Sequence, residues 1–252
     1  MISFFRKIRQ RLFAENKLIR YLLYAIGEIV LVVIGILIAL QINNSNEQEK
    51  RIQKEIEVLH LFQEALKTDL KKFRYISENY ARSKASISRI LNYLENDLPY
   101  QDSLAADFFN STYVYEQTSF TNGPFETLKS AGLELVSNTS LQKKILEVYD
   151  DWDPWMETTE NSYVTMVLDA GLDLYQTRFD QFWKGVEKDS VLTGVMHPID
   201  YEGLKNDPEY IYFLKTQMNM MYWRVEYPIR DGTLHGTLLK DLIEKELEQL
   251  AK

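Results

Sequence analysis

The sequence contains no cysteine, and only 10 of its 252 residues are glycine and 6 are proline. The absence of cysteine excludes disulfides, thiolate metal sites and a cysteine nucleophile. The scarcity of glycine and proline argues against a β-sandwich, a β-barrel or a collagen-like chain. The three histidines are scattered, and the P-loop, G-x-G-x-x-G, G-x-S-x-G and H-E-x-x-H patterns do not occur. We therefore expect a protein that is not an enzyme and that holds no metal and no cofactor.

Positive charge is also in short supply, since the formal net charge is −8. An acidic chain is a poor ligand for nucleic acid, so we expect no nucleic-acid partner. Hydrophobic residues make up 45% of the chain and aromatic residues 13%, which is too much apolar surface to leave in water. The chain is therefore predicted to fold, with a length that allows one or two domains.

One long hydrophobic run dominates the sequence. Residues 21–42 contain a single formal charge, Glu28. A helix of this length measures about 33 Å, which is enough to cross a hydrocarbon core of about 30 Å. A cleaved signal peptide is disfavoured, because the run is too long and no small-residue cleavage site follows it. The run is predicted to be a transmembrane helix in contact with membrane lipids.

The charges on either side of this run predict its orientation. Residues 1–20 carry six basic side chains against one acidic side chain, which places them in the cytoplasm by the positive-inside rule. Residues 43–252 carry 23 basic and 35 acidic residues, a net charge of −12. We therefore expect a single-pass inner-membrane protein with a cytoplasmic segment (1–20), a transmembrane helix (21–42) and an exported domain (43–252). In a Gram-negative cell that domain is periplasmic.

The basic N-terminal segment has two interpretations that stay open. Its apolar residues follow helical spacing, which is typical of an amphipathic helix lying on anionic headgroups. The alternative is a simple topology signal. The basic residues concerned are Arg6, Lys7, Arg9, Arg11, Lys17 and Arg20.

Two stretches carry a resemblance to a known family. The first is the run KLIRYLLYAIGEIVLVVIGILIALQINNSNE, which begins at Lys17, and the second is ETLKSAGLELVSNTSLQKKI, from Glu126 to Ile145. Both resemble a large family of single-span membrane proteins from Bacteroidota, catalogued as domain-of-unknown-function family 6090. In the second stretch Val136 stands for the isoleucine of an L-x-L-I-x-N motif, and Ser45 stands where the family often has tryptophan. The resemblance implies membership and a membrane location, and it implies no activity.

A helical stripe follows the hydrophobic run. No glycine or proline occurs between Gly35 and Pro99, and seven apolar residues recur at intervals of seven: Ile52, Leu59, Leu66, Phe73, Tyr80, Ile87 and Leu94. This pattern predicts a helix over about 46–96, with a possible kink at the Asn-rich stretch 43–46. The stripe fits the long helix of an intramolecular bundle or an intermolecular coiled coil, and interruptions at the second seam position favour the bundle.

The rest of the exported domain also favours helices. Asn138 or Thr139, Pro124 and Asp207 are typical helix starts, and Gly132 is a typical helix end. Helices are predicted to break at Pro154 and Pro228. Residues 185–206 are predicted to be an irregular connection. The predicted fold class is therefore all-α: a single transmembrane helix followed by an exported helical bundle with one long helix.

Glu28 is the most informative residue of the predicted span. An ionisable group at that depth is costly and usually faces protein or water. Gly27, Gly35 and Ala39 lie on a neighbouring stripe of small residues that lets another helix approach closely. We expect contact with a protein partner or a second copy in the membrane. A sharper hypothesis makes Glu28 the titrating carboxylate of an ion-coupled accessory subunit in a multi-span complex, and the plain alternative is a carboxyl that reaches the headgroups.

An aromatic and methionine run marks a possible partner surface. Such side chains are favoured at adaptable binding surfaces, but helical spacing makes them ordinary core residues more often. The candidate surface residues are Tyr210, Tyr212, Phe213, Met221 and Trp223. Trp152 and Trp155 could stack on glycans, although packing within the fold is the commoner role.

Three smaller patterns complete the candidate sites. Ser103 and Ser190 each follow an aspartate and precede an aliphatic residue, a short pattern for O-glycosylation in Bacteroidota, and helix capping explains Ser103 equally well. His60 and Glu64 lie four residues apart, but two ligands do not make a metal site. The function predicted from the sequence is a non-enzymatic membrane protein whose exported helical domain binds or senses a partner in the cell envelope.

Overall fold

The computed structural model describes residues 17–114, 118–182, 185–188 and 191–251. They fall into two compact units, Met1–Lys54 and Glu55–Lys252. Outside the described residues lie five candidate site residues: Arg6, Lys7, Arg9, Arg11 and Ser190. The side chains of Lys17 and Arg20 are not described either.

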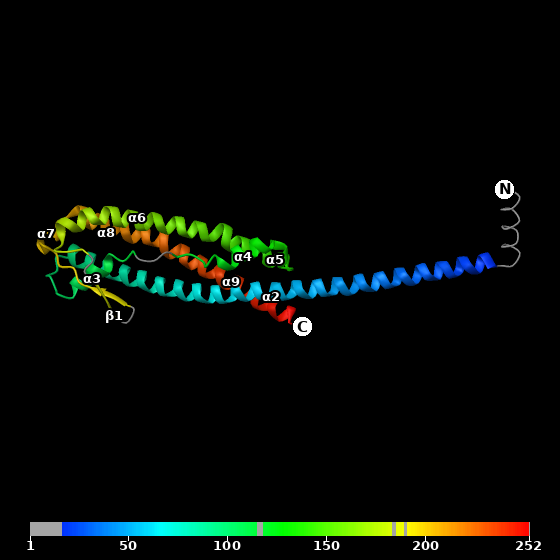
Figure 1. Ribbon diagram of the computed structural model, residues 1–252. Helices are drawn as coiled ribbons and strands as arrows, with labels where there is room; N and C mark the ends of the chain where they lie inside the picture. Colours follow the sequence, from blue (N-terminus) through cyan, green and yellow to red (C-terminus); the bar gives the residue numbers. More distant parts are fainter. Residues whose placement is uncertain (1–16, 115–117, 183–184, 189–190, 252) are drawn as a thin grey trace, which may run out of the picture. The chain divides into compact units, whose positions relative to one another are not determined.

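The fold is all-α, as the sequence predicts, with one small hairpin. The elements in chain order are α2 (Lys17–Glu95), α3 (Leu104–Ser111), α4 (Gly123–Ala131), η1 (Leu133–Leu135), α5 (Thr139–Leu146), η2 (Glu147–Trp152), α6 (Asp153–Arg178), β1 (Gly185–Lys188), β2 (Val191–Gly194), α7 (Tyr201–Lys205), α8 (Pro208–Met221), η3 (Tyr222–Glu226) and α9 (Tyr227–Leu250). Figure 1 shows their arrangement.

The long helix α2 ends at Glu95, within one residue of its predicted end. No helix break occurs at Asn43–Asn46, where a kink seemed possible, and the Asn43 side-chain amide donates to Glu47 at 3.0 Å. The N-terminal part of α2 is long and apolar enough to cross a membrane, and its side chains from Ala25 to Lys50 are exposed.

The expected irregular connection at 185–206 is wrong in part. Strands β1 and β2 pair in antiparallel register, with Gly185 opposite Gly194 and Lys188 opposite Val191. The short helix α7 follows, and the Asp200 side chain caps it by accepting from the Gly203 N–H at 2.9 Å. Gly185 and Gly194 lie at the open end of the hairpin ladder, so they mark its boundary.

The two predicted proline breaks are also wrong, for one physical reason. Proline lacks an N–H and its ring crowds the carbonyl four residues before it, so it is tolerated in the first turn of a helix. Pro154 and Pro228 both stand in the first turn of an α-helical segment, and a wider π-helical turn, η2 or η3, precedes each. The chain therefore continues as two long helical arms, α5–η2–α6 and α8–η3–α9.

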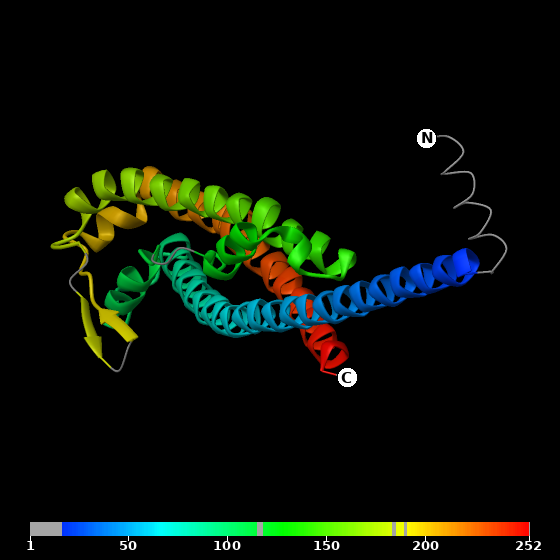
Figure 2. The same ribbon diagram turned by 45° about the vertical axis from the view of Figure 1, so that its right-hand side comes forward.

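These arms form one bundle with the part of α2 beyond residue 54. Helix α6 packs against α8, and α5 packs against α9, so the arms are antiparallel (Figure 2). From Leu59 to Leu94 the heptad stripe of α2 is buried in the shared core. Phe62 meets Tyr149 of η2 at a ring distance of 5.4 Å, and Tyr80 meets Tyr163 of α6 at 6.0 Å. Because its own chain covers this stripe, the intramolecular bundle is confirmed over the coiled coil.

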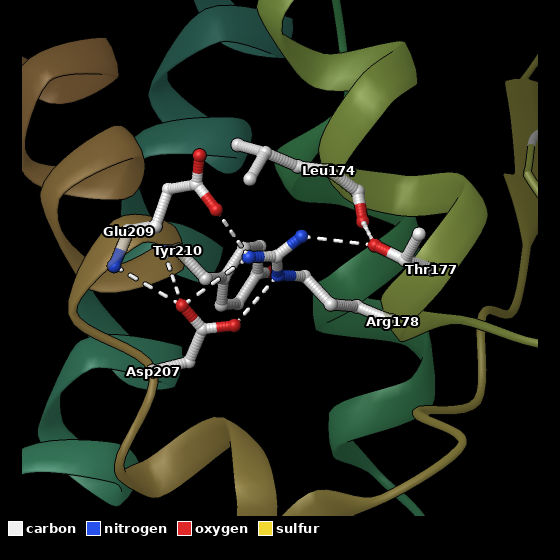
Figure 3. A network of polar contacts seen from close by, with 6 residues as sticks. All are labelled: Leu174, Thr177, Arg178, Asp207, Glu209 and Tyr210. Carbon is white, nitrogen blue, oxygen red and sulfur yellow. Dashed lines mark hydrogen bonds and ion pairs between the residues drawn. The ribbon is translucent and has the colours of Figure 1, made fainter.

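An arginine network joins the facing ends of α6 and α8 (Figure 3). Arg178 Nε donates to Asp207 Oδ2 at 2.6 Å, and Arg178 Nη2 donates to Glu209 Oε2 at 2.6 Å. Asp207 also caps α8 by accepting from the N–H groups of Glu209 and Tyr210. The hydrogen bond from Arg178 lowers the pKa of Asp207. This network fixes the turn that makes the arms antiparallel.

Carboxylates of α2 and α6, two of them buried, hold the segment 118–121, which has no regular secondary structure. The Thr118 N–H donates to Glu160, the Phe120 N–H to Asp153 and the Thr121 N–H to Asp69, at 2.5, 2.6 and 2.8 Å. These bonds give the backbone N–H groups of an irregular segment the acceptors that a helix or strand would otherwise supply. Placing Asp153 here has a cost, because burial raises its pKa to about 6 although the hydrogen bond from Phe120 acts to lower it, and the charges of Glu157 and Asp69 add to the rise.

Asp153→Asn is expected to stabilise the protein at pH 7.5 by on the order of 1 kcal/mol, a value reduced because solvent screens this half-buried carboxyl, and by much less near pH 4.5. The pKa of Asp153 in the folded state lies above its ordinary value of 3.8, so ionisation lowers the free energy of unfolding above about pH 6. That cost disappears as the pH falls towards 4. Asparagine keeps the acceptor for the Phe120 N–H without the charge.

Urea unfolding of the full chain in mild detergent, followed by circular dichroism at both pH values, measures this difference. Asp150→Asn, at an exposed neighbouring carboxylate, is the control. An equal gain from Asp153→Asn at both pH values would contradict the assignment.

Helix α9 approaches its neighbours closely at Gly236. A Cβ atom there would lie 2.9 Å from Phe120 Cε1 and 3.3 Å from Leu70 Cδ2. Alanine gains about 1 kcal/mol of helix propensity, but overpacking costs about 1–3 kcal/mol, so Gly236→Ala is expected to destabilise the domain. Gly232→Ala is the matched control, because its Cβ would meet chiefly the flexible end of Met156. Thermal unfolding should rank Gly236→Ala below Gly232→Ala, and the reverse order would refute this packing constraint.

Candidate functional site

A chain of aromatic rings runs over the two arms beside the π turns. Trp152 and Trp155 meet at a ring distance of 5.3 Å, Trp155 and Tyr227 at 6.1 Å, Tyr227 and Trp223 at 6.4 Å, and Trp223 and Tyr222 at 4.9 Å. Trp223 is 62% exposed, Tyr222 40% and Trp155 39%. We call these five residues the aromatic surface. It is the candidate functional site, because large exposed rings are costly unless something binds them.

The local sequence explains why these rings come together. Tyr222 and Trp223 lie in η3, and Tyr227 is the first residue of α9. Trp152 ends η2, and Trp155 stands in the first turn of α6. Since η3 packs against α6 and η2 packs against α9, the antiparallel arms bring both groups to one place.

A polar cluster borders the tryptophan end of the aromatic surface. Lys144 Nζ lies 3.0 Å from Glu147 Oε1, His235 Nδ1 lies 2.9 Å from the same oxygen, and the His235 ring lies 4.2 Å from that of Trp152. Burial raises the pKa of Glu147, but the hydrogen bond and charge of Lys144, with a further contribution from His235, outweigh it and lower the pKa. An ionised carboxylate therefore lies next to Trp152.

Cations lie beside the tyrosine end. Lys84 Nζ lies 5.8 Å from the ring centre of Tyr222 and makes an ion pair with Glu226 at 2.7 Å. The Arg230 guanidinium lies 4.9 Å from the ring centre of Tyr227. Exposed tryptophan and tyrosine with arginine beside them is the composition of binding hot spots in protein interfaces. The aromatic surface therefore has the composition of a binding surface.

The stretch 126–145 forms a structural joint, and its last turn carries Lys144 of the polar cluster beside the aromatic surface. Gly132 has φ +97°, a conformation that favours glycine, and Val136 is fully buried. The Ser137 N–H donates to Glu55 of α2 at 2.7 Å. Asn138 caps α5 by accepting from Ser140 N and Leu141 N, and its amide donates to Glu246 of α9 at 2.6 Å.

A family model described as a family of unknown function, DUF6090, matches residues 28–153, which is half of the chain. The chain belongs to this family. The match includes the later part of the apolar run, the joint at 126–145, and Trp152 of the aromatic surface. No curated protein and no solved structure matches the chain. Membership in DUF6090 therefore implies no activity for the chain.

The five residues of the aromatic and methionine run that were predicted to form a partner surface lie partly in the core and partly on the surface. Tyr210, Phe213 and Met221 are buried in the core, so they cannot form a partner surface. Tyr212 is 73% exposed and Trp223 is 62% exposed. Trp223 joins the aromatic surface, whereas none of the ring contacts found in the described part of the chain involves Tyr212. Helical spacing could have separated these two groups, but only the fold brings Trp152 and Trp155 to Trp223.

The candidate residues of the apolar run are all exposed. Gly27, Gly35 and Ala39 lie on the surface of α2 with Glu28, and a Cβ added to either glycine would meet no atom within 4 Å. This arrangement leaves room for a close helix partner. The described residues show neither a partner nor a hydrogen bond that identifies a role for Glu28.

The remaining candidates, Ser103, His60 and Glu64, have ordinary structural surroundings. Ser103 is exposed and stands at the start of α3, but its side chain makes no capping hydrogen bond, so the capping explanation is wrong. His60 lies 3.2 Å from Gln63, whereas Glu64 lies 3.7 Å from Lys67. Within the described ranges, no group of three or more suitable side chains could hold a metal ion.

Proposed function

We propose that this member of DUF6090 is a non-enzymatic, single-pass inner-membrane protein of the cell envelope in Bacteroidota. Its helical domain lies outside the cytoplasm and binds a partner protein through the aromatic surface. One observation carries the proposal: a bundle with a fully buried core leaves Trp223, Tyr222 and Trp155 exposed in a single ring chain.

The anchor rests on the first unit of the chain. The N-terminal part of α2 exposes Leu31, Ile36 and Leu37 by 58% or more, together with many other apolar side chains. Such a helix is stable in hydrocarbon and costly in water. The excess of basic residues before this helix and the acidic domain after it support an N-terminus in the cytoplasm. The absence of cysteine is compatible with either compartment, so orientation has to be measured.

The ring geometry favours a protein partner over a glycan. Trp152 and Trp155 lie at 88°, Trp155 and Tyr227 at 85°, and Tyr222 and Trp223 at 83°. Perpendicular rings form no continuous flat platform on which successive sugar rings could stack. They offer edges and faces in several directions, which suits the interdigitating side chains of a protein interface.

The topology has a direct test because the chain contains no cysteine. Single variants Ser3→Cys and Ala251→Cys are treated, in whole cells with a permeable outer membrane, with a maleimide that cannot cross the inner membrane. We expect Ala251→Cys to react at once and Ser3→Cys to react only after the inner membrane is opened. The opposite pattern, or equal reaction at both sites, would overturn the proposed orientation.

Partner binding is tested by site-specific photo-crosslinking in the native cell. A photoreactive phenylalanine analogue at Trp223 is expected to give a discrete adduct with another protein, and the same analogue at Tyr212 is expected to give none. Tyr212 is a matched control, because it is aromatic and no less exposed than Trp223 but lies outside the aromatic surface.

A second variant separates binding from folding. With the analogue at Trp155, Trp223→Ala should weaken adduct formation by about 30-fold, since an aromatic hot spot contributes about 2 kcal/mol. The thermal unfolding temperature should change little, because most of the Trp223 side chain is exposed. Identical adduct patterns at Trp223 and Tyr212, or no adduct at either, would refute the partner surface.

A further inference from the structure

A second exposed apolar feature lies on α9. Leu234 is 56% exposed, Leu238 46% and Leu242 37%, and the three are spaced four residues apart. The core-facing side of the same helix carries Gly236, Leu239 and Ile243. We call the three exposed leucines the leucine stripe. It differs from the aromatic surface in chemistry, because leucine is uncommon among interface hot spots but common where helices pack ridge into groove.

The charges around the leucine stripe indicate what can cover it. The charged residues on α9 from 230 to 245 number three basic and three acidic: Arg230, Lys240, Lys245, Asp231, Asp241 and Glu244. Two pairs among them neutralise each other, Arg230 with Asp231 at 3.1 Å and Lys240 with Glu244 at 2.8 Å. Residues 43–252 as a whole carry a net charge of −12.

A balanced face on an acidic domain suits a second copy of the same chain. Elsewhere two copies repel each other, because both are acidic. On α9 from 230 to 245 the charges sum to zero, so the apolar side chains of the stripe can meet without a net electrostatic cost from this part of the helix. A strongly basic partner would gain nothing here and would prefer the acidic faces.

We propose that the leucine stripe is the seam of a two-fold symmetric homodimer. Two-fold pairs use the same patch on both copies, and an apolar stripe is complementary to itself. Three leucines bury far less than the roughly 800 Å² per partner of a standard interface. The seam therefore depends on the membrane anchor, which confines the two copies and raises their effective concentration. This inference rests on the membrane anchor of the proposed function, and it does not depend on the aromatic surface.

Disulfide trapping in native membranes tests the seam, again because the full chain has no cysteine of its own. Leu234→Cys, Leu238→Cys and Leu242→Cys are oxidised with copper phenanthroline and separated on a non-reducing gel. We expect at least one stripe position to give a dimer of twice the chain mass, at least tenfold above Tyr212→Cys. If the two α9 helices are parallel, disulfides form at all three positions. If they are antiparallel, disulfides form chiefly at the position nearest the two-fold axis.

A charged substitution in the seam distinguishes a specific dimer from disulfides formed by random collision. Leu238→Glu should reduce trapping at Leu234→Cys or Leu242→Cys at least tenfold, because two carboxylates would face each other across the axis. The side chain at this position is almost half exposed, so an unchanged circular dichroism spectrum is expected and confirms folding. Trapping no stronger than at Tyr212→Cys, or trapping that survives Leu238→Glu, would overturn the homodimer, and either result leaves the photo-crosslinking test at Trp223 unaffected.

Discussion

The apolar stripe of α2 is the constraint on which the second unit depends. Leu59, Leu66, Phe73 and Ile87 are fully buried, and a single helix has no means of covering such a stripe by itself. The remainder of the chain covers it with two antiparallel arms. The irregular segment at 118–121 also packs there through Phe120, and its N–H groups need acceptors that no helix or strand supplies. Asp69 on α2 and Asp153 on α6 provide them, at the cost of a raised pKa for both carboxyls.

The sequence predicts most of this architecture, because the relevant signals are local. Intervals of seven give α2 its buried stripe, and Asn138 and Asp207 mark the starts of α5 and α8 through their own side-chain caps. What it does not reveal are contacts between distant segments. The bonds from 118–122 to Asp69 and Glu160 follow no short-range rule, and the aromatic surface joins residues about 70 positions apart.

The family motif illustrates a further limit of motif-based inference. Gly132, Val136 and Asn138 are explained by backbone conformation, burial, a helix cap and a tie to α9. The most distinctive stretch of the second unit is therefore a joint that holds α4 and α5 against α2 and α9. Nothing in its geometry requires a ligand, and the exposed groups that could recognise one lie elsewhere, on the π turns and on α9.

The π turns account both for the incorrectly predicted helix breaks at Pro154 and Pro228 and for the position of the aromatic surface. Core residues of the second arm include Gln217, Met221, Val225 and Ile229, three successive steps of four. In a regular α-helix with 3.6 residues per turn, such steps would rotate the core face away by about 120°, whereas a wider turn keeps it aligned. Trp223 and Tyr227 are also four apart, so the same widening keeps both on the outer side. The spacing that retains the core thus also assembles the exposed rings, and runs of core residues at intervals of four are the signal from which η3 could have been predicted.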